Sequence, residues 1–152
     1  MPVQETRKFG RISFDKQSEI EFPAGLPGFE ARRRFLAIKL PDTDPLVFLQ
    51  SLEDPDLCFV TLPVSAVDPR FRLRLSEEDL EVLGIAGGRQ PRLGPDVLGL
   101  AIVSIRASGP TANLLAPVVV NVANLKAVQA VLADSGYSHQ HPILPQEAAV
   151  CS

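Results

Sequence analysis

The sequence predicts an all-β fold with one short helix, arranged as a small antiparallel β-barrel-like or sandwich domain. Three observations favour this class: apolar and polar residues alternate with a period of two in many segments, turn-forming residues recur at roughly 8–12-residue spacing, and helical periodicity is rare. A chain of 152 residues that is 45% hydrophobic and 22% charged is typical of one globular domain. We expect residues 1–152 to form a single domain, with a frayed tail after about residue 145.

The first half of the chain contains five expected strands. Residues 18–22 (SEIEF) and 35–40 (FLAIKL) alternate apolar and polar side chains, which is typical of half-buried strands. Residues 46–52 and 57–63 are apolar on both faces and predict central strands, joined by the turn residues EDPD. Residues 70–75 (RFRLRL) alternate most strictly and predict a strand with its arginines facing outward.

One segment, residues 76–84 (SEEDLEVLG), has the pattern of a short helix. Ser76 can cap its N-terminus, acids fill its first turn, and Gly84 can end it. Two leucines within it form an apolar stripe that can face the core. The glycine-rich residues 87–94 (GGRQPRLG) that follow predict a loop and lack the Lys-Ser/Thr pair of a phosphate-binding loop.

The last third of the chain predicts further strands. Residues 97–105 form a long apolar run, in which Gly99 indicates a bulge or a bend. Residues 118–122 (VVVNV) predict another buried strand. Residues 128–133 are compatible with a helical turn or a strand, and the short apolar run in this context favours a strand.

The segment 22–30 (FPAGLPGFE) interrupts this series with two prolines and two glycines. The prolines exclude a regular helix, and the glycines permit backbone angles that are closed to other residues. Although GLPG superficially matches an RNA-binding GxxG loop, that loop joins two helices and usually carries basic residues. We expect a rigid turn that leads into a strand. Leu26 and Phe29 can be core residues or part of a partner surface, and we favour the core for Phe29.

The overall charge and the ends of the sequence limit the classes of partner and compartment. A net charge of −3 speaks against binding nucleic acid by phosphate neutralisation, because such domains are usually basic. Residues 1–14 lack the apolar stretch of a signal peptide, and no apolar run approaches the ~20 residues of a membrane helix. Cys58 and Cys151 form no disulfide framework, so we expect a cytoplasmic protein without membrane contact.

The sequence offers little chemistry for catalysis or metal binding. His139 and His141 are spaced to share one face of a strand, but zinc needs three or four ligands and Cys151 is the one cysteine nearby. Cys58 lies in an apolar segment, where we expect a small buried hydrophobe rather than a thiolate. The serines are scattered and none lies in a G-x-S-x-G motif. We therefore expect no catalytic residues, no metal, no cofactor and no enzymatic activity.

Charged residues form basic and acidic candidate surfaces. Three arginines along the face of segment 70–75 repel each other unless acids lie opposite, so we expect Glu19 and Glu21 to face them from a neighbouring strand. The alternative is a β-barrel that binds single-stranded nucleic acid directly through these arginines and Arg32–Arg34, although the few aromatic residues offer few stacking platforms. Two acidic segments form a candidate patch for a basic partner: Glu53, Asp54 and Asp56, and Glu77, Glu78, Asp79 and Glu81.

Two asparagines lie in apolar surroundings, Asn113 in TANLLAP and Asn121 in VVVNV. If these side chains are buried, their amides must be hydrogen-bonded. The simplest interpretation of Thr111 and Asn113 is a side-chain-to-backbone turn at the entry to a strand.

Six segments occur in a characteristic order between about Ile12 and Ile143: FPAGLPGFE, RRFLAIKL, PLVFLQSLEDPDLCFVTLPV, LSEEDLEVLGI, GPTANLLAPVVVNVANLKAVQAVL and YSHQHPI. In this order they closely resemble the FliW family of flagellar assembly factors. The most specific pieces are GLPGFE, LQS and TANLLAPVVVN, and the resemblance covers nearly the whole chain.

The resemblance implies a small, barrel-like, non-enzymatic bacterial protein that acts in the cytoplasm. Members of the family bind flagellin and the RNA-binding translational regulator CsrA. When flagellin is exported, the freed factor captures CsrA, which then no longer represses translation of flagellin mRNA. An acidic protein attracts a basic RNA-binding protein and repels phosphate, which fits this role. We expect flagellin and CsrA as partners, no direct contact with nucleic acid, and a monomer.

The family segments also supply the residues that we expect at partner contacts. They comprise an apolar turn, the polar end of a strand, the acids of the helix, and the turn that contains an asparagine. These residues are Leu26, Phe29, Gln50, Ser51, Glu77, Glu78, Asp79, Asn113 and Leu114.

Overall fold

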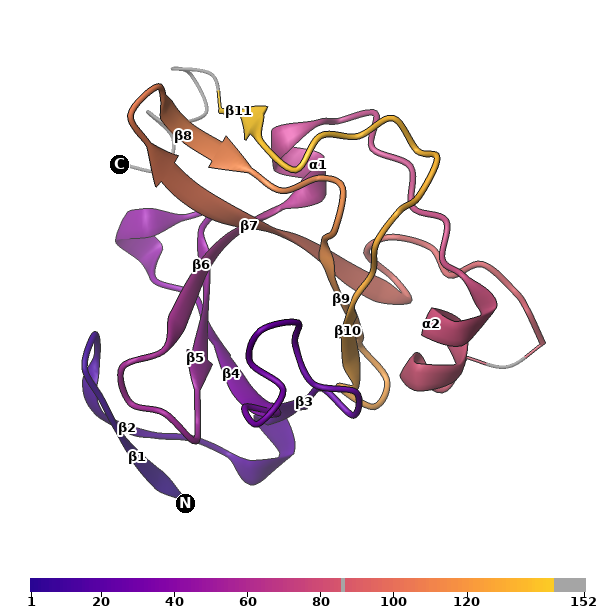
Figure 1. Ribbon diagram of the computed structural model, residues 1–152. Coiled ribbons are helices and arrows are strands. Elements are labelled where there is room, and N and C mark those ends of the chain that lie inside the picture. The colour runs from indigo at the N-terminus through magenta and orange to yellow at the C-terminus, as the bar shows by residue number, and fades with distance from the viewer. Residues whose placement is uncertain (86, 144–152) are drawn as a thin grey trace.

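The computed structural model describes residues 1–85 and 87–143 and confirms the all-β class with mostly antiparallel strands (Figure 1). The expected frayed tail after residue 145 lies outside these ranges. The strands are β1 Val3–Thr6, β2 Gly10–Ser13, β3 Ile20–Glu21, β4 Arg34–Ile38, β5 Val47–Ser51, β6 Cys58–Pro63, β7 Val97–Arg106, β8 Gly109–Ala112, β9 Val118–Asn121, β10 Ala127–Gln129 and β11 His141–Pro142. Within the described ranges, no helix is long and apolar enough to cross a membrane.

Seven strands form a barrel in the order β3-β4-β5-β6-β7-β9-β10. Every pair of neighbours in this order is antiparallel. Because antiparallel neighbours alternate in direction, the first and the last of seven strands run parallel to each other. They meet at a parallel bridge between Glu21 and Lys126, where the Glu21 N–H donates to the Leu125 carbonyl at 3.0 Å. This contact closes the sheet into a barrel.

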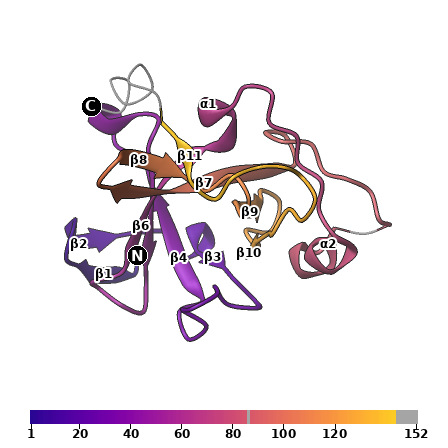
Figure 2. The same cartoon turned by 45° about the horizontal axis from the view of Figure 1, so that its top comes forward.

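Strand β7 is the longest strand and continues past the barrel. Its first residues pair with β9, while Val103–Arg106 pair with β8, and β11 pairs with β8 in turn. The β7–β8 hairpin therefore projects from one end of the barrel, and β1 and β2 form a separate hairpin on the wall (Figures 1 and 2).

Of the bulge or bend that we expected at Gly99, the bulge is absent, because the pairing of β7 with β9 continues through Gly99 opposite Val119 without a break. Glycine is needed here for space. A Cβ atom at this position would lie 2.9 Å from the side chains of both Leu93 and Val64. The missing side chain allows these two residues to pack directly on β7.

Apolar side chains form one cluster inside the barrel and two on its outer surface. The interior cluster contains Ile20, Phe22, Leu26, Phe35, Val47, Leu49, Leu100, Val118, Val120 and Ala127. A larger outer cluster, with residues of α1 (Val64–Val67) and α2 (Glu77–Leu83), includes Leu62, Leu80, Leu83, Ala101, Leu114 and Val119. The third cluster, Phe14, Leu36 and Leu52, packs against Ile12 of the β1–β2 hairpin.

The predicted helix is confirmed as α2. The Ser76 side chain accepts a hydrogen bond from the Asp79 N–H at 3.1 Å, and Gly84 ends the helix with a φ of 74°. Leu80 and Leu83 are buried against the outer cluster. The structure also contains short helical turns that the sequence pattern did not predict: the four-residue α1 and two 3-10 helices, Lys16–Ser18 and Pro41–Thr43.

The prediction of a strand at residues 70–75 is wrong, although burial alternates as expected. Phe71 and Leu75 are 8% and 4% exposed, while the arginines face the solvent. None of the strands in the described ranges pairs with this segment. Instead, the Gln90 side-chain amide donates to the Leu75 carbonyl at 2.9 Å and accepts from the Leu75 N–H at 2.8 Å. The period of two therefore reflects burial against the outer cluster and not pairing in a sheet.

The acids that we expected opposite these arginines have other neighbours. Glu19 forms an ion pair with Arg34 at 3.4 Å, and Glu21 belongs to the bridge that closes the barrel. The reason is topological: β3 lies between β4 and β10, whereas residues 70–75 run from α1 to α2 on the outside of the barrel (Figure 1).

Most of the remaining predicted strands are confirmed with shorter bounds, whereas β7 extends one residue further than predicted, to Arg106. Of the ambiguous segment 128–133, residues 128–129 belong to β10 and the following residues have no regular structure. The segment 18–22 contains only the two residues of β3.

Replacing Phe35 by alanine is expected to lower the free energy of unfolding by about 3–5 kcal/mol, because its fully buried ring fills the barrel interior. The matched control is Phe29→Ala, which is expected to cost about 1–2 kcal/mol because the Phe29 side chain is 41% exposed. Urea unfolding of the two variants measures the difference. Equal losses would contradict the placement of Phe35 inside the barrel and Phe29 at its surface.

Candidate functional site

The residues expected at partner contacts fall into three separate parts of the structure. Leu26 and Phe29 lie in the β3–β4 connection, next to the end of β5 that carries Gln50 and Ser51. The acids Glu77, Glu78 and Asp79 occupy the first turn of α2. Asn113 and Leu114 follow β8.

The segment 22–30 forms a rigid turn, as expected. The Phe29 N–H donates to the Leu26 carbonyl at 2.8 Å across Pro27 and Gly28, and Gly28 has a φ of 84°. Proline followed by a glycine with positive φ is the pattern of a type II turn. Arg33 braces the segment, because its guanidinium donates to the carbonyls of Pro23 at 2.6 Å and Glu30 at 3.2 Å.

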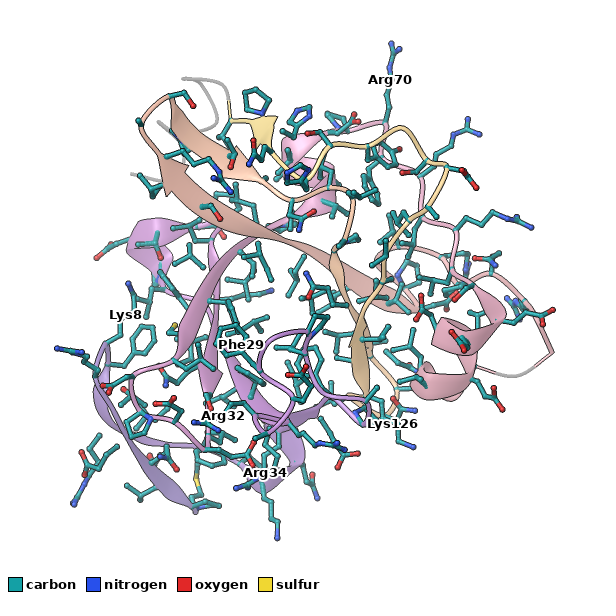
Figure 3. All side chains as sticks on the ribbon, in the orientation of Figure 1. Lys8, Phe29, Arg32, Arg34, Arg70 and Lys126 are labelled. Atoms are coloured by element: carbon teal, nitrogen blue, oxygen red, sulfur yellow. The ribbon has the colours of Figure 1, made fainter. Side chains whose placement is uncertain are left out.

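This turn separates its two large apolar side chains. Leu26 is 2% exposed and belongs to the barrel interior, whereas Phe29 is 41% exposed. The preference for a core position of Phe29 was therefore wrong. Its ring edge contacts Phe59 at a centroid distance of 5.4 Å, and the ring lies over the barrel opening (Figure 3). The turn thus presents an aromatic side chain on a stiff support.

Gln50 and Ser51 are fully buried and shape the turn between β5 and β6. The Gln50 side-chain NH₂ faces four backbone carbonyls at 3.1–3.4 Å, those of Ser51, Asp54, Pro55 and Leu57. The Ser51 hydroxyl accepts hydrogen bonds from the N–H groups of Glu53 at 3.1 Å and Asp54 at 2.9 Å. Both side chains satisfy buried backbone groups, which explains polar residues at the end of an apolar strand.

Glu53 ties this turn to the proline-rich segment. Its carboxylate accepts from the N–H groups of Arg33 at 2.6 Å and Arg34 at 2.9 Å. Burial raises the pKa of the Glu53 carboxyl, but these N–H groups and the charges of Arg34 and Arg32 outweigh it and lower the pKa below its ordinary value. Two segments that are far apart in sequence are thereby locked together.

Four of the residues expected at partner contacts have almost no exposed surface: Leu26, Gln50, Ser51 and Leu114. Their side chains therefore support the exposed residues around them and are not themselves part of the surface. Phe29 and the helix acids Glu77 and Glu78 are exposed, so a direct contact stays a prediction for these residues.

The acids of α2 form a surface that we call the acidic helix surface: the exposed Glu77, Glu78 and Glu81, and the half-buried Asp79. Within the described part of the chain, none of these carboxylates lies within 4.0 Å of a Lys, Arg or His nitrogen. Burial raises the pKa of the half-buried Asp79, the Ser76 hydrogen bond lowers it, and the charge of Glu78 raises it further; the result lies above the ordinary value.

Two asparagines fix the C-terminal end of this helix to the barrel. The side-chain NH₂ groups of Asn121 and Asn124 donate to the Leu83 carbonyl at 2.8 and 3.0 Å. Asn121 is 7% exposed, and its side-chain oxygen accepts from the Ala123 N–H at 3.0 Å. The buried amide is hydrogen-bonded as expected, and it holds the acidic helix surface in a defined position.

In the turn after β8, the expected side-chain-to-backbone bond is made by Asn113, whereas Thr111 lies within β8 itself. The Asn113 side-chain oxygen accepts from the Ala116 N–H at 2.9 Å, and Thr111 is 7% exposed. The Leu114 N–H donates to the Ser138 carbonyl at 3.0 Å, which attaches the segment before β11 to the barrel. This arrangement supports a structural role for the asparagine-containing motif.

Two of the pockets contain few ionisable groups. A pocket of about 330 Å³ beside the end of β9 is lined by Arg89 and Asp96, and Asp96 already pairs with Arg92 at 3.3 Å. An apolar pocket of about 230 Å³ between β4, α1 and β7 has Lys39 as its one ionisable lining residue among those described. Neither pocket resembles a set of converging catalytic groups.

The structure separates the residues considered for metal or thiol chemistry. His139 is exposed, His141 pairs with Ala112 across β11 and β8, and Cys151 lies outside the described residues. Among residues 1–85 and 87–143, no three His, Cys, Asp or Glu side chains are grouped to hold a metal ion. Burial raises the pKa of the half-buried Cys58 thiol despite the charge of Lys8, which disfavours a thiolate.

Sequence reasoning missed Arg33 and Asn124, whose side chains position the two surfaces. Arg33 was treated as part of a basic patch, but its guanidinium is bound to two carbonyls of its own connection. Asn124 lies three residues after Asn121 in a turn, where a side-chain amide often binds backbone groups. The spacing between these two asparagines was the one feature of the sequence that could have indicated the role of Asn124.

The Glu53→Gln variant is expected to be less stable than the wild type at neutral pH by up to about 1 kcal/mol, because an exposed carboxylate with two N–H donors loses its charge. Because the pKa of Glu53 is lowered in the folded state, this stabilisation is fully present above the ordinary carboxyl pKa and is lost as the pH falls through the lowered pKa of the folded state. The difference between variant and wild type should therefore shrink in acid. Glu30→Gln is the control, since Glu30 contributes its carbonyl to this network. Urea unfolding across the pH range measures both, and a difference independent of pH would refute this role.

The Asn121→Ala variant is expected to lose about 1–3 kcal/mol of stability, because it removes a buried donor to Leu83 and an acceptor for Ala123. Amide exchange in α2 should also become faster. Asn124→Ala, which removes an exposed side chain on the same carbonyl, should have a smaller effect. Thermal unfolding with hydrogen exchange tests this; unchanged exchange in α2 would show that Asn121 does not anchor the helix.

Comparison with known proteins gives a consistent result across nearly the whole chain. The family model described as "FliW protein" matches residues 3–143. A flagellar assembly factor FliW from Syntrophomonas wolfei is 34% identical over 134 residues, covering 88% of this chain and 83% of the relative. The Bacillus subtilis flagellar assembly factor FliW is 31% identical over 141 residues, covering 93% and 96%.

The fold agrees with these sequence matches. A crystal structure of the flagellar assembly factor FliW superposes with a TM-score of 0.83 at 30% identity, covering 95% of this chain and 99% of the other. The segments that carried the resemblance thus form three features of this structure: the closed barrel, the turn at residues 22–30 and the helix α2. The chain belongs to the FliW family, whose curated relatives are named flagellar assembly factors.

Proposed function

We propose that this protein is a non-enzymatic flagellar assembly factor that binds flagellin and antagonises CsrA, thereby relieving repression of flagellin mRNA translation. The observation that carries the proposal is the acidic helix surface, which is anchored to the barrel through Asn121 and is free of ion pairs within the described part of the chain. Family membership supports a partner among flagellar components, because the curated relatives are named flagellar assembly factors.

An acidic, anchored surface suits a basic RNA-binding protein for two reasons. Its negative potential speeds the encounter with a positive partner, and it repels the phosphates of competing RNA. The net charge of −3 is too small to do this alone, so the local density of carboxylates on α2 matters. Because the helix is held in place, little ordering is needed on binding.

The flagellin contact is assigned to the exposed Phe29. The ring borders a shallow depression of about 320 Å³ that is lined by Gly28, Glu30, Ala31, Arg32 and Asp54. A rigidly presented aromatic side chain beside a depression is the kind of anchor that dominates protein interfaces. The two partners would then use separate parts of the surface. The proposal further includes a single-domain, cytoplasmic monomer that needs no metal or cofactor and does not contact nucleic acid itself.

Titration calorimetry with purified CsrA and flagellin tests the proposal. Replacing Glu77, Glu78 and Glu81 together by glutamine should weaken CsrA binding by at least about tenfold and reduce its dependence on salt, because the attraction is electrostatic. Phe29→Ala should weaken flagellin binding and leave CsrA binding unchanged.

The matched control replaces Glu21 and Glu30 by glutamine and Asp134 by asparagine, which changes the net charge equally at exposed residues outside α2. If the control weakens CsrA binding as much as the helix variant, net charge and not the acidic helix surface is responsible. Absence of binding to either partner at protein concentrations of tens of micromolar would refute the proposed function.

A further inference from the structure

Residues 70–75, which we call the arginine segment, carry three guanidinium groups that the proposed function does not use. Arg70, Arg72 and Arg74 are exposed, and Arg70 points away from the body of the protein (Figure 3). Their side chains have no hydrogen bond or ion pair to any residue of the described ranges. Most other arginines are held by acids: Arg7, Arg11, Arg32, Arg34 and Arg92.

The backbone of the arginine segment is also open for pairing. The N–H and C=O groups of Leu73 and Arg74 have no partner within residues 1–85 and 87–143. At Leu75, the Gln90 amide binds both the N–H and the C=O, which is the pattern that a neighbouring strand makes. In an extended chain, Leu73 directs its own pair of groups toward the same edge as Leu75. Gln90 therefore marks one end of this edge. The Phe71 N–H, which donates to the Asp68 carbonyl at 2.9 Å, marks the other end, so a further strand can pair with the backbone of Leu73.

Packing keeps this segment in place without a sheet. Phe71 stacks on Tyr137 at a centroid distance of 4.5 Å and an interplanar angle of 19°, and Leu75 is buried in the outer cluster. The Tyr137 hydroxyl accepts from the Arg72 N–H at 2.9 Å on the other edge. A segment that is already ordered loses little entropy when a partner binds.

We propose that the arginine segment binds an acidic peptide segment in extended conformation, which adds as a strand along the edge marked by Leu73. Side chains two residues apart in a strand are about 7 Å apart, and those on one face of a neighbouring strand have the same spacing. Carboxylates at every second residue of the peptide therefore lie opposite Arg70, Arg72 and Arg74 as cross-strand pairs. Backbone pairing provides the alignment and the guanidinium groups select for acids.

The observations favour a peptide over single-stranded nucleic acid. Bases need exposed aromatic faces, but Phe71 is 8% exposed and is stacked on Tyr137. The arginine segment leads directly into the acidic helix surface, where Glu77 and Glu78 repel a continuing line of phosphates. An acidic peptide can end or change its charge at that point. This inference does not depend on the binding of flagellin or CsrA.

Fluorescence anisotropy at low salt tests the proposal with a labelled peptide that alternates glutamate with threonine. Replacing Arg70, Arg72 and Arg74 together by glutamine is expected to weaken binding by at least about tenfold, because three charge pairs are lost. The matched control, Arg7→Gln with Arg11→Gln and Arg106→Gln, removes three exposed arginines elsewhere and should bind as the wild type does. Hydrogen exchange should show new protection of the Leu73 amide when the peptide is bound, and no new protection of the Arg74 amide, which faces the other edge. Thermal unfolding of both triple variants confirms that they are folded.

Three results would overturn the inference. A peptide of the same composition with its glutamates in one block could bind equally well, which would indicate unspecific attraction. Oligouridylate could bind more tightly than the alternating peptide, which would assign the segment to nucleic acid. Light scattering could show that the arginine triple variant abolishes self-association, which would make a second copy of the chain the partner.

Discussion

Closure of the barrel is the constraint on which the rest of the structure depends. With seven strands, antiparallel pairing leaves β3 and β10 parallel, and they meet at one bridge between Glu21 and Lys126. Such a short seam holds only if the interior is filled and the adjoining connections are rigid. Leu26 fills the interior from the β3–β4 connection, and Arg33 and Glu53 hold that connection to the β5–β6 turn. The polar residues of the most specific sequence segments thus stabilise the closed barrel, and they also hold the turn that presents Phe29 at the surface.

The charged groups that are available for binding are those that do not stabilise the barrel. The buried side-chain NH₂ groups of Gln50 and Asn121 donate to backbone carbonyls. The carboxylates of α2 and the guanidiniums of the arginine segment remain directed at solvent, and they are adjacent in sequence with opposite sign. A net charge of −3 conceals this contrast.

Local sequence patterns predicted most of the fold. The predictions were wrong where two different physical causes produce the same sequence pattern. The helix limits predicted from Ser76 and Gly84 are correct, because capping is a local interaction. The alternation of residues 70–75 predicted correctly which side chains are buried. Burial on one side does not require a sheet, however, and the backbone of this segment is hydrogen-bonded by the side chains of Gln90 and Tyr137 instead of by a neighbouring strand. Gly99 was needed for the approach of Leu93 and Val64, which no local pattern reveals. For the candidate sites, motif membership identified Gln50 and Ser51, yet it could not show that they are buried.

The central claim is that a preformed barrel binds other macromolecules through its outer surface without opening. Hydrogen exchange of the protein, free and saturated with CsrA, tests this claim most directly. The account predicts slower exchange on binding in α2 and in the loop that follows it, with unchanged exchange in β5 and β7. Faster exchange of β5 or β7 in the complex, or an α2 that is unaffected by CsrA, would contradict it.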